Sequence, residues 1–87
     1  MKISVDLSLY PLNENFIPPI KTFIDALKSH EDLEVVCNTL STQIYGEFDV
    51  VMAAVNQVLK QSFQKFGHQV LVAKYLKGDR HPKRIKD

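Results

Sequence analysis

The chain has 87 residues, which is enough for one small domain and too few for separate catalytic and regulatory domains. Hydrophobic residues make up 45% and charged residues 24% of the sequence, a balance that excludes a disordered chain. The formal net charge of +1 conceals an uneven distribution: residues 1–76 carry six basic and eight acidic side chains, whereas residues 77–87 carry five basic and two acidic ones. A domain this small often gains core by associating with further copies of itself.

The first expected element is a strand over residues 2–10, which Pro11 ends because proline cannot donate to a strand ladder. Apolar and polar residues alternate along it, with the period of two of a half-buried strand. Its apolar face holds Ile3, Val5, Leu7 and Leu9, and its polar face holds Ser4, Asp6, Ser8 and Tyr10.

A helix is expected next, over residues 16–29, because apolar residues recur there at spacings of three and four. Pro18 and Pro19 fall in its first turn, where a missing amide hydrogen costs little. Asn13 or Asn15 is expected to cap it. The apolar stripe consists of Phe16, Ile20, Phe23, Ile24 and Leu27.

Four further elements follow. They are strands over residues 33–38 and 42–47, a helix over residues 49–66 and a strand over residues 68–76. Asp49 is a plausible N-cap of the second helix, and Gly67 stands where a glycine commonly ends a helix. Gly46 either ends the third strand or provides an unusual backbone angle there.

The element order β-α-β-β-α-β predicts an α+β, ferredoxin-like fold, a four-stranded antiparallel sheet with both helices on one face. The domain is expected to span residues 1–78, followed by a basic, flexible tail over residues 79–87. In the last strand Val70 and Val72 alternate with Leu71 and Ala73, so both faces are apolar. We therefore expect the open sheet face to be partly covered by another subunit, with a polar pocket left on it.

Several classes of site and partner are excluded. The three histidines show no metal-ligand spacing, so no metal site is expected. Cys37 is the single cysteine, fits a reducing compartment and is expected to be a packed small hydrophobe. Neither a signal peptide nor a membrane span is expected, which indicates a soluble, cytoplasmic protein. The acidic body argues against nucleic acid.

Catalytic constellations are also weak. Ser41 and Thr42 have no histidine nearby to act as a base, so no catalytic triad is predicted. Asp49 fits a role at the start of a helix, where the helix dipole favours an acid. Asp6 and Glu47 remain as candidate acids or bases, but we expect a protein that binds its ligand without catalysis.

Residues 38–49 concentrate short side chains that donate and accept hydrogen bonds, with aromatic residues close by. From composition this is either an ordinary polar hairpin or one side of a ligand site, which needs such groups beside apolar walls. The hydrogen-bonding residues are Asn38, Thr39, Ser41, Thr42 and Gln43, and the candidate walls are Tyr10, Ile44, Tyr45 and Phe48.

The run Ser8-Leu9-Tyr10-Pro11-Leu12, together with the stretch from Asn38 to Val51, resembles the thiamine-binding YkoF-like family over residues 2–76. The most specific part of the resemblance is Ser41, Thr42, Gly46, Glu47, Asp49 and Val51. The resemblance implies a ferredoxin-like domain that pairs its sheets in dimers or dimers of dimers. It also implies binding of thiamine or its hydroxymethylpyrimidine moiety, as ligand and not as cofactor, in thiamine salvage, transport or sensing.

A flat aminopyrimidine would need a wall and a few fixed hydrogen-bonding groups. Tyr10 is the expected wall or hydroxyl contact, and Glu47 the expected carboxylate partner of the amine. Asn38, Thr39, Ser41 and Thr42 are the expected hydrogen-bonding residues. Two alternatives remain: an oligomeric regulatory or sensor domain for another small metabolite, and a small dimeric ferredoxin-like enzyme.

Overall fold

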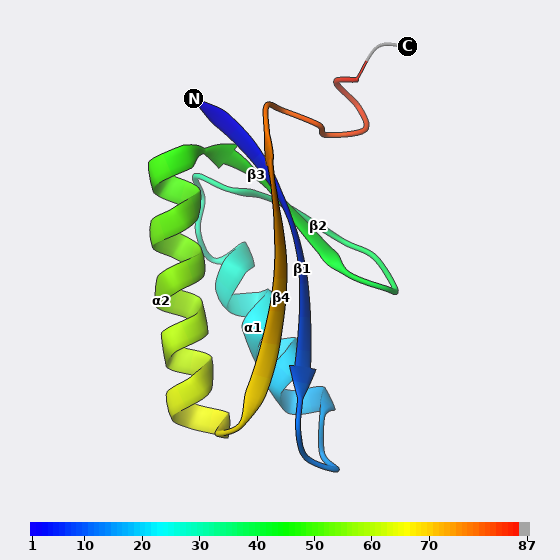
Figure 1. Cartoon of the computed structure of the whole chain (residues 1–87), viewed down its shortest axis with the longest axis vertical. Coiled ribbons are helices and arrows are strands. Elements are labelled where there is room, and N and C mark those ends of the chain that lie inside the picture. Colours follow the sequence, from blue (N-terminus) through cyan, green and yellow to red (C-terminus); the bar gives the residue numbers. More distant parts are fainter. Residues whose placement is uncertain (86–87) are drawn as a thin grey trace.

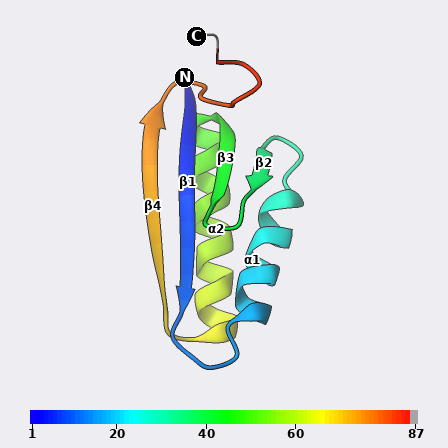
Figure 2. The ribbon, with the colours of Figure 1, turned by 90° about the vertical axis from the view of Figure 1, so that its right-hand side faces the viewer.

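A computed structural model of the protein describes residues 1–85 and contains four strands and two helices (Figure 1). The elements are β1 (Lys2–Pro11), α1 (Ile17–Lys28), β2 (Glu34–Cys37), β3 (Thr42–Glu47), α2 (Phe48–Phe66) and β4 (Gln69–Lys77). The strands form one antiparallel sheet in the order β2-β3-β1-β4. Both helices cover the same face of this sheet, as the two views show (Figures 1 and 2). The predicted ferredoxin-like α+β fold is therefore confirmed.

The helix ends differ in detail from the expectations. Phe16 occupies the N-cap of α1 and makes no side-chain capping bond, so the prediction of a capping asparagine is wrong. Helix α2 begins at Phe48, which places Asp49 inside the first turn, where its charge favours the helix dipole, instead of at the cap. Gly67 ends α2 as predicted, with φ of 80° and its N–H donating to the carbonyl of Phe63 at 3.1 Å.

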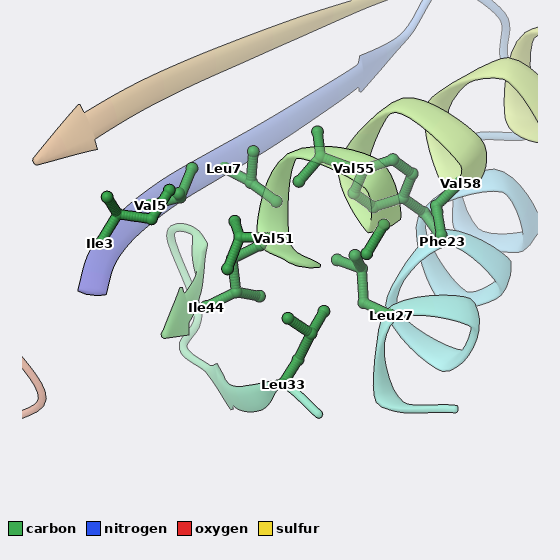
Figure 3. Packing of buried hydrophobic residues seen from close by; sticks show 11 residues of the cluster. Ile3, Val5, Leu7, Phe23, Leu27, Leu33, Ile44, Val51, Val55 and Val58 are labelled. Atoms are coloured by element: carbon green, nitrogen blue, oxygen red, sulfur yellow. The ribbon is translucent and has the colours of Figure 1, made fainter. Parts of the chain in front are cut away.

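The core lies between the sheet and the two helices (Figure 3). Each layer contributes fully buried side chains, among them Leu7 from β1, Ile44 from β3, Leu27 from α1 and Val51 from α2. Burying apolar surface stabilises the fold by roughly 25 cal/mol per Å². Both apolar patterns that the sequence shows, the alternation of β1 and the stripe of α1, therefore point into one core.

Position 46 requires a glycine because neighbouring atoms leave little room for a side chain, and not because its backbone angle is unusual. Among residues 1–85, positive φ angles occur at Gly67 and Gly78, so the alternative of an unusual angle at Gly46 is wrong. A Cβ atom at Gly46 would lie 3.2 Å from Cγ2 of Val51 and 3.4 Å from the carbonyl oxygen of Asp32. The absent side chain lets β3 and α2 approach closely at the corner where one leads into the other.

The strand register assigns residues to the open face of the sheet. Ser4 lies opposite Tyr45 and Leu76, and Asp6 lies opposite Gln43 and Lys74. Farther along, Ser8 faces Val72 and Tyr10 faces Val70. The open face is thus polar and charged at one end and apolar at the other. The apolar end consists of Tyr10, Val70 and Val72, with 55%, 46% and 44% of their surface exposed.

Cys37 is exposed, which corrects the expectation of a packed side chain. It is the last residue of β2, a four-residue strand at the edge of the sheet. Its Sγ lies 3.8 Å from Oγ1 of Thr42, its partner in the register. No helix among residues 1–85 is both long enough and apolar enough to span a membrane.

Candidate functional site

A small pocket opens between β1, α1 and the turn that joins β2 to β3. We call it the hairpin pocket; its volume is about 100 Å³. Its polar lining comes from the turn and from Ser8, and its apolar lining comes from β1, α1 and Leu40. The lining residues are Leu7, Ser8, Leu9, Ile20, Phe23, Ile24, Asn38, Thr39, Leu40, Ser41 and Thr42.

Four of the six residues predicted to bind a ligand line this pocket together. Asn38 and Thr39 lie in the exposed turn, Ser41 is half-buried, and Thr42 is buried at the start of β3. The turn closes through the N–H of Asn38, which donates to the carbonyl of Ser41 at 2.9 Å. Polar groups beside aliphatic and aromatic side chains are the surroundings that a small heterocycle needs.

The other two predicted residues, Tyr10 and Glu47, lie elsewhere. Tyr10 lies on the open face opposite Val70 of β4, two residues beyond Ser8, and does not line the hairpin pocket. Glu47 ends β3 at the opposite end from Thr42. Its carboxylate accepts a bond of 3.0 Å from the terminal amine of Met1 and lies 3.6 Å from the Lys2 ammonium. The bond from the terminal amine lowers the pKa of Glu47.

A chain of polar side chains runs from the turn to the open face. The amide nitrogen of Asn38 donates to Oε1 of Gln43. The amide nitrogen of Gln43 lies 2.7 Å from Oδ1 of Asp6 and 2.7 Å from Oγ of Ser41. Hydrogen bonding from Ser41, and next from Gln43, lowers the pKa of Asp6, so this carboxyl group is ionised at neutral pH. The chain connects Asn38, which lines the hairpin pocket, with Asp6 on the open face.

A second and larger cavity, of about 380 Å³, lies on the open face at its polar end. We call it the sheet-face pocket. It is lined by Ser4, Val5, Asp6, Gln43, Tyr45, Lys74, Tyr75, Leu76 and Arg80. A polar pocket on this face is expected from the sequence, and the alternation of β1 identifies Ser4 and Asp6. The roles of Gln43, Lys74 and Arg80 are not predicted, because strand register and the path of the C-terminal segment decide them.

Residues 78–85, which we call the C-terminal strap, cross the end of the open face (Figure 2). The N–H of Gly78 donates to the carbonyl of Lys2 at 2.8 Å. The hydroxyl of Ser4 donates to the carbonyl of Gly78 and accepts from the N–H of Arg80, both at 2.8 Å. Ser4 is consequently only 7% exposed, although it lies on the open face.

Side chains fix the strap as well. The ring of His81 packs 4.9 Å from the ring of Tyr45, and His81 is 8% exposed. Arg84 lies 2.8 Å from a carboxylate oxygen of Glu34 and also bonds to Asp79. Hydrogen bonds from Arg84 lower the pKa of Glu34 and of Asp79.

The sequence predicts a flexible basic tail over residues 79–87. Over residues 79–85 the structure instead shows a segment that these contacts attach to β1, β2 and β3. A run of charges in the sequence does not show which residues it will contact in the fold. Here Glu34 pairs with Arg84, and Tyr45 packs against His81. Residues 86–87 lie outside the described part of the chain.

Within residues 1–85, no group of three or more histidine, cysteine, aspartate or glutamate side chains is placed to hold a metal ion. Neither the hairpin pocket nor the sheet-face pocket therefore contains such a cluster among the described residues. One is small, neutral and partly apolar, and the other is larger and charged.

Comparisons with known proteins give a family. The model of the YkoF-related family matches residues 2–76. Among solved structures, a protein from Streptococcus pneumoniae is 27% identical and has a TM-score of 0.83; the match covers 92% of this chain and 90% of that chain. A candidate thiamine biosynthesis/salvage protein from Thermotoga maritima is 20% identical and has a TM-score of 0.81; the match covers 90% and 85% of the two chains.

A hypothetical protein from Methanocaldococcus jannascii is also 20% identical, with a TM-score of 0.78 over 97% of this chain and 88% of that chain. No curated protein matches the sequence. The structural neighbours agree with the fold, and the family model covers nearly the whole domain, including the residues on which the resemblance depends. The chain belongs to the YkoF-related family.

Proposed function

We propose that this protein binds hydroxymethylpyrimidine, either free or as the pyrimidine end of thiamine, and serves thiamine salvage, transport or sensing without catalysis. The observation that carries the proposal is the hairpin pocket, where Asn38, Thr39, Ser41 and Thr42 meet an apolar wall that includes Phe23. The family and the Thermotoga maritima neighbour support the choice of ligand.

The size and charge of the hairpin pocket favour the pyrimidine. At about 100 Å³ the pocket is well below the roughly 300–1,000 Å³ typical of pockets that bury drug-sized ligands. One small ring suits that volume better than the two linked rings of thiamine. The lining contains hydroxyl and amide groups but no charged side chain, which suits a neutral aminopyrimidine and leaves the thiazolium cation outside.

The same lining argues for binding without chemistry. None of the described residues that line the hairpin pocket is a histidine, carboxylate, lysine or cysteine, so the pocket offers no ordinary general acid or base. Cys37 directly precedes the lining residue Asn38, and Asp6 is connected to Asn38 through Gln43, but neither Cys37 nor Asp6 lines the pocket.

Calorimetric titration with hydroxymethylpyrimidine and with thiamine tests this proposal. The variant Thr42→Val keeps the shape of a buried side chain and removes its hydroxyl, so we expect binding to weaken by about tenfold, the worth of one hydrogen bond. The variant Glu47→Gln is the matched control and is expected to bind normally, because Glu47 lies away from the pocket. Absence of heat from both ligands with the folded wild-type protein would contradict the proposal.

We further propose that two copies pair through the apolar end of the open face, in a homodimer or in a homotetramer built from it. Three exposed apolar side chains, Tyr10, Val70 and Val72, gather there, while the strap occupies the other end. Sedimentation velocity at micromolar concentration is expected to show an oligomer that Val72→Lys shifts toward monomer. Lys77→Gln, on the opposite face of β4, is expected to leave it unchanged. A monomeric wild-type protein would refute the pairing.

A further inference from the structure

We propose that the sheet-face pocket is a second ligand site, for a flat organic anion that joins an aromatic ring to a carboxylate or phosphate group. It lies on the face of the sheet opposite the helices and shares no lining residue with the hairpin pocket. The inference therefore stands independently of pyrimidine binding.

The shape of the pocket suits a ring. Its volume of about 380 Å³ falls within the roughly 300–1,000 Å³ of small-molecule pockets. Its base is the surface of the sheet, and its apolar walls include Tyr45 and Leu76. Leu76 is 50% exposed, so apolar surface is available to a ligand, whereas Tyr45 is held in place beneath His81.

The charges of the pocket suit an anion. Lys74 and Arg80 contribute two positive charges against the single negative charge of Asp6. Among the described residues, neither basic side chain takes part in a salt bridge, whereas the neighbouring Arg84 is bound to Glu34 and Asp79. A carboxylate or phosphate placed between Lys74 and Arg80 would form charge-assisted hydrogen bonds, which are about twice as strong as neutral ones.

Asp6 and Gln43 orient the ligand. The amide of Gln43 is bound at both ends, to Asn38 through its oxygen and to Asp6 through its nitrogen, so it holds Asp6 in place. The ionised Asp6 carboxylate keeps free lone pairs that can accept a donor group from the ligand. It also repels the anionic group of the ligand, which is thereby directed toward Lys74 and Arg80.

The strap places Arg80 before any ligand arrives. The backbone N–H of Arg80 donates to Ser4 on β1, and the next residue, His81, packs on Tyr45. The backbone of Arg80 is thus held on both sides, and its side chain is among those that line the pocket. A site whose groups are positioned in advance loses less entropy on binding.

The test is a titration of the full-length protein, followed by NMR and calorimetry, with phenyl phosphate and benzoate as ring-bearing anions. At least one of them is expected to bind and to shift the backbone signals of Asp6, Tyr45 and Leu76. Lys74→Gln and Arg80→Gln are each expected to weaken that binding by about tenfold, as loss of a charged hydrogen-bond partner does. Lys77→Gln removes the same charge from the opposite face of β4 and is expected to have no effect.

Two neutral or ringless probes complete the experiment. Benzyl alcohol has the ring without the charge, inorganic phosphate has the charge without the ring, and both are expected to bind much more weakly. Equal binding of either one, equal losses from Lys77→Gln, or no binding of either ring-bearing anion would overturn the proposal. Thr42→Val is expected to leave this titration unchanged, so failure of the hairpin pocket and failure of this site are separate results.

Discussion

Replacing Phe23 with alanine is expected to lower the free energy of unfolding by about 3–5 kcal/mol, the usual cost of removing a buried phenylalanine. Phe23 is 3% exposed and packs from α1 into the core between the helices and the sheet (Figure 3). The loss combines apolar surface returned to water with the cavity left behind. Urea unfolding of the variant and the wild type measures it.

Matched variants separate burial from the position of Phe23 in the helix. Thr22→Ala changes an exposed neighbour in α1 and is expected to leave the free energy of unfolding within about 0.5 kcal/mol of wild type. Phe23→Leu keeps most of the apolar volume and is expected to fall between the two. A loss below 1 kcal/mol in Phe23→Ala would show that α1 does not pack as described.

The variant Gly46→Ala is expected to cost about 1–3 kcal/mol of unfolding free energy, because the added methyl group overpacks a close contact. Its Cβ would meet Cγ2 of Val51 at 3.2 Å and the backbone of Asp32 at 3.4 Å. Gly67→Ala is expected to cost a similar amount, about 1–3 kcal/mol, for a different reason. There φ is 80° and nothing lies within 4 Å of the new atom, so the cost is backbone strain.

A double-mutant cycle with Val51→Ala distinguishes the two causes. Shortening Val51 relieves the contact at Gly46, so Gly46→Ala with Val51→Ala is expected to cost less than the sum of the single variants, by about 0.5–3 kcal/mol. Gly67 lies at the other end of α2, so its variant is expected to add to Val51→Ala within about 0.5 kcal/mol. Simple additivity in both cycles would contradict the steric explanation for Gly46.

The two pockets are connected by the chain from Asn38 through Gln43 to Asp6. Asn38 lines the hairpin pocket and Asp6 lines the sheet-face pocket. Gln43 lies opposite Asp6 in the strand register and is hydrogen-bonded to both residues. A polar network of this kind is fixed when every member has its partners, and it loses order when one is removed. Gln43 is therefore the residue at which the two sites have a shared structural support.

The sequence by itself determined the fold. The alternation of residues 2–10 and the stripe of Phe23 and Leu27 set the faces of β1 and α1, because side chains repeat every two residues in a strand and about every 3.6 residues in a helix. It also brought together the polar residues 38–42 that line the hairpin pocket, since neighbours in a short turn stay neighbours in space.

Tertiary structure decided the rest, because it depends on contacts between residues far apart in the chain. Tyr10, Glu47 and Thr42 are all predicted to contact one ligand, but Tyr10 lies two residues beyond Ser8 on β1 and Glu47 lies at the far end of β3 from Thr42. The basic segment after Gly78 pairs with Ser4, Glu34 and Tyr45, contacts that no local pattern predicts. The excess of positive charge in residues 77–87 thus has structural partners, because Arg84 pairs with Glu34 and Arg80 lines the sheet-face pocket.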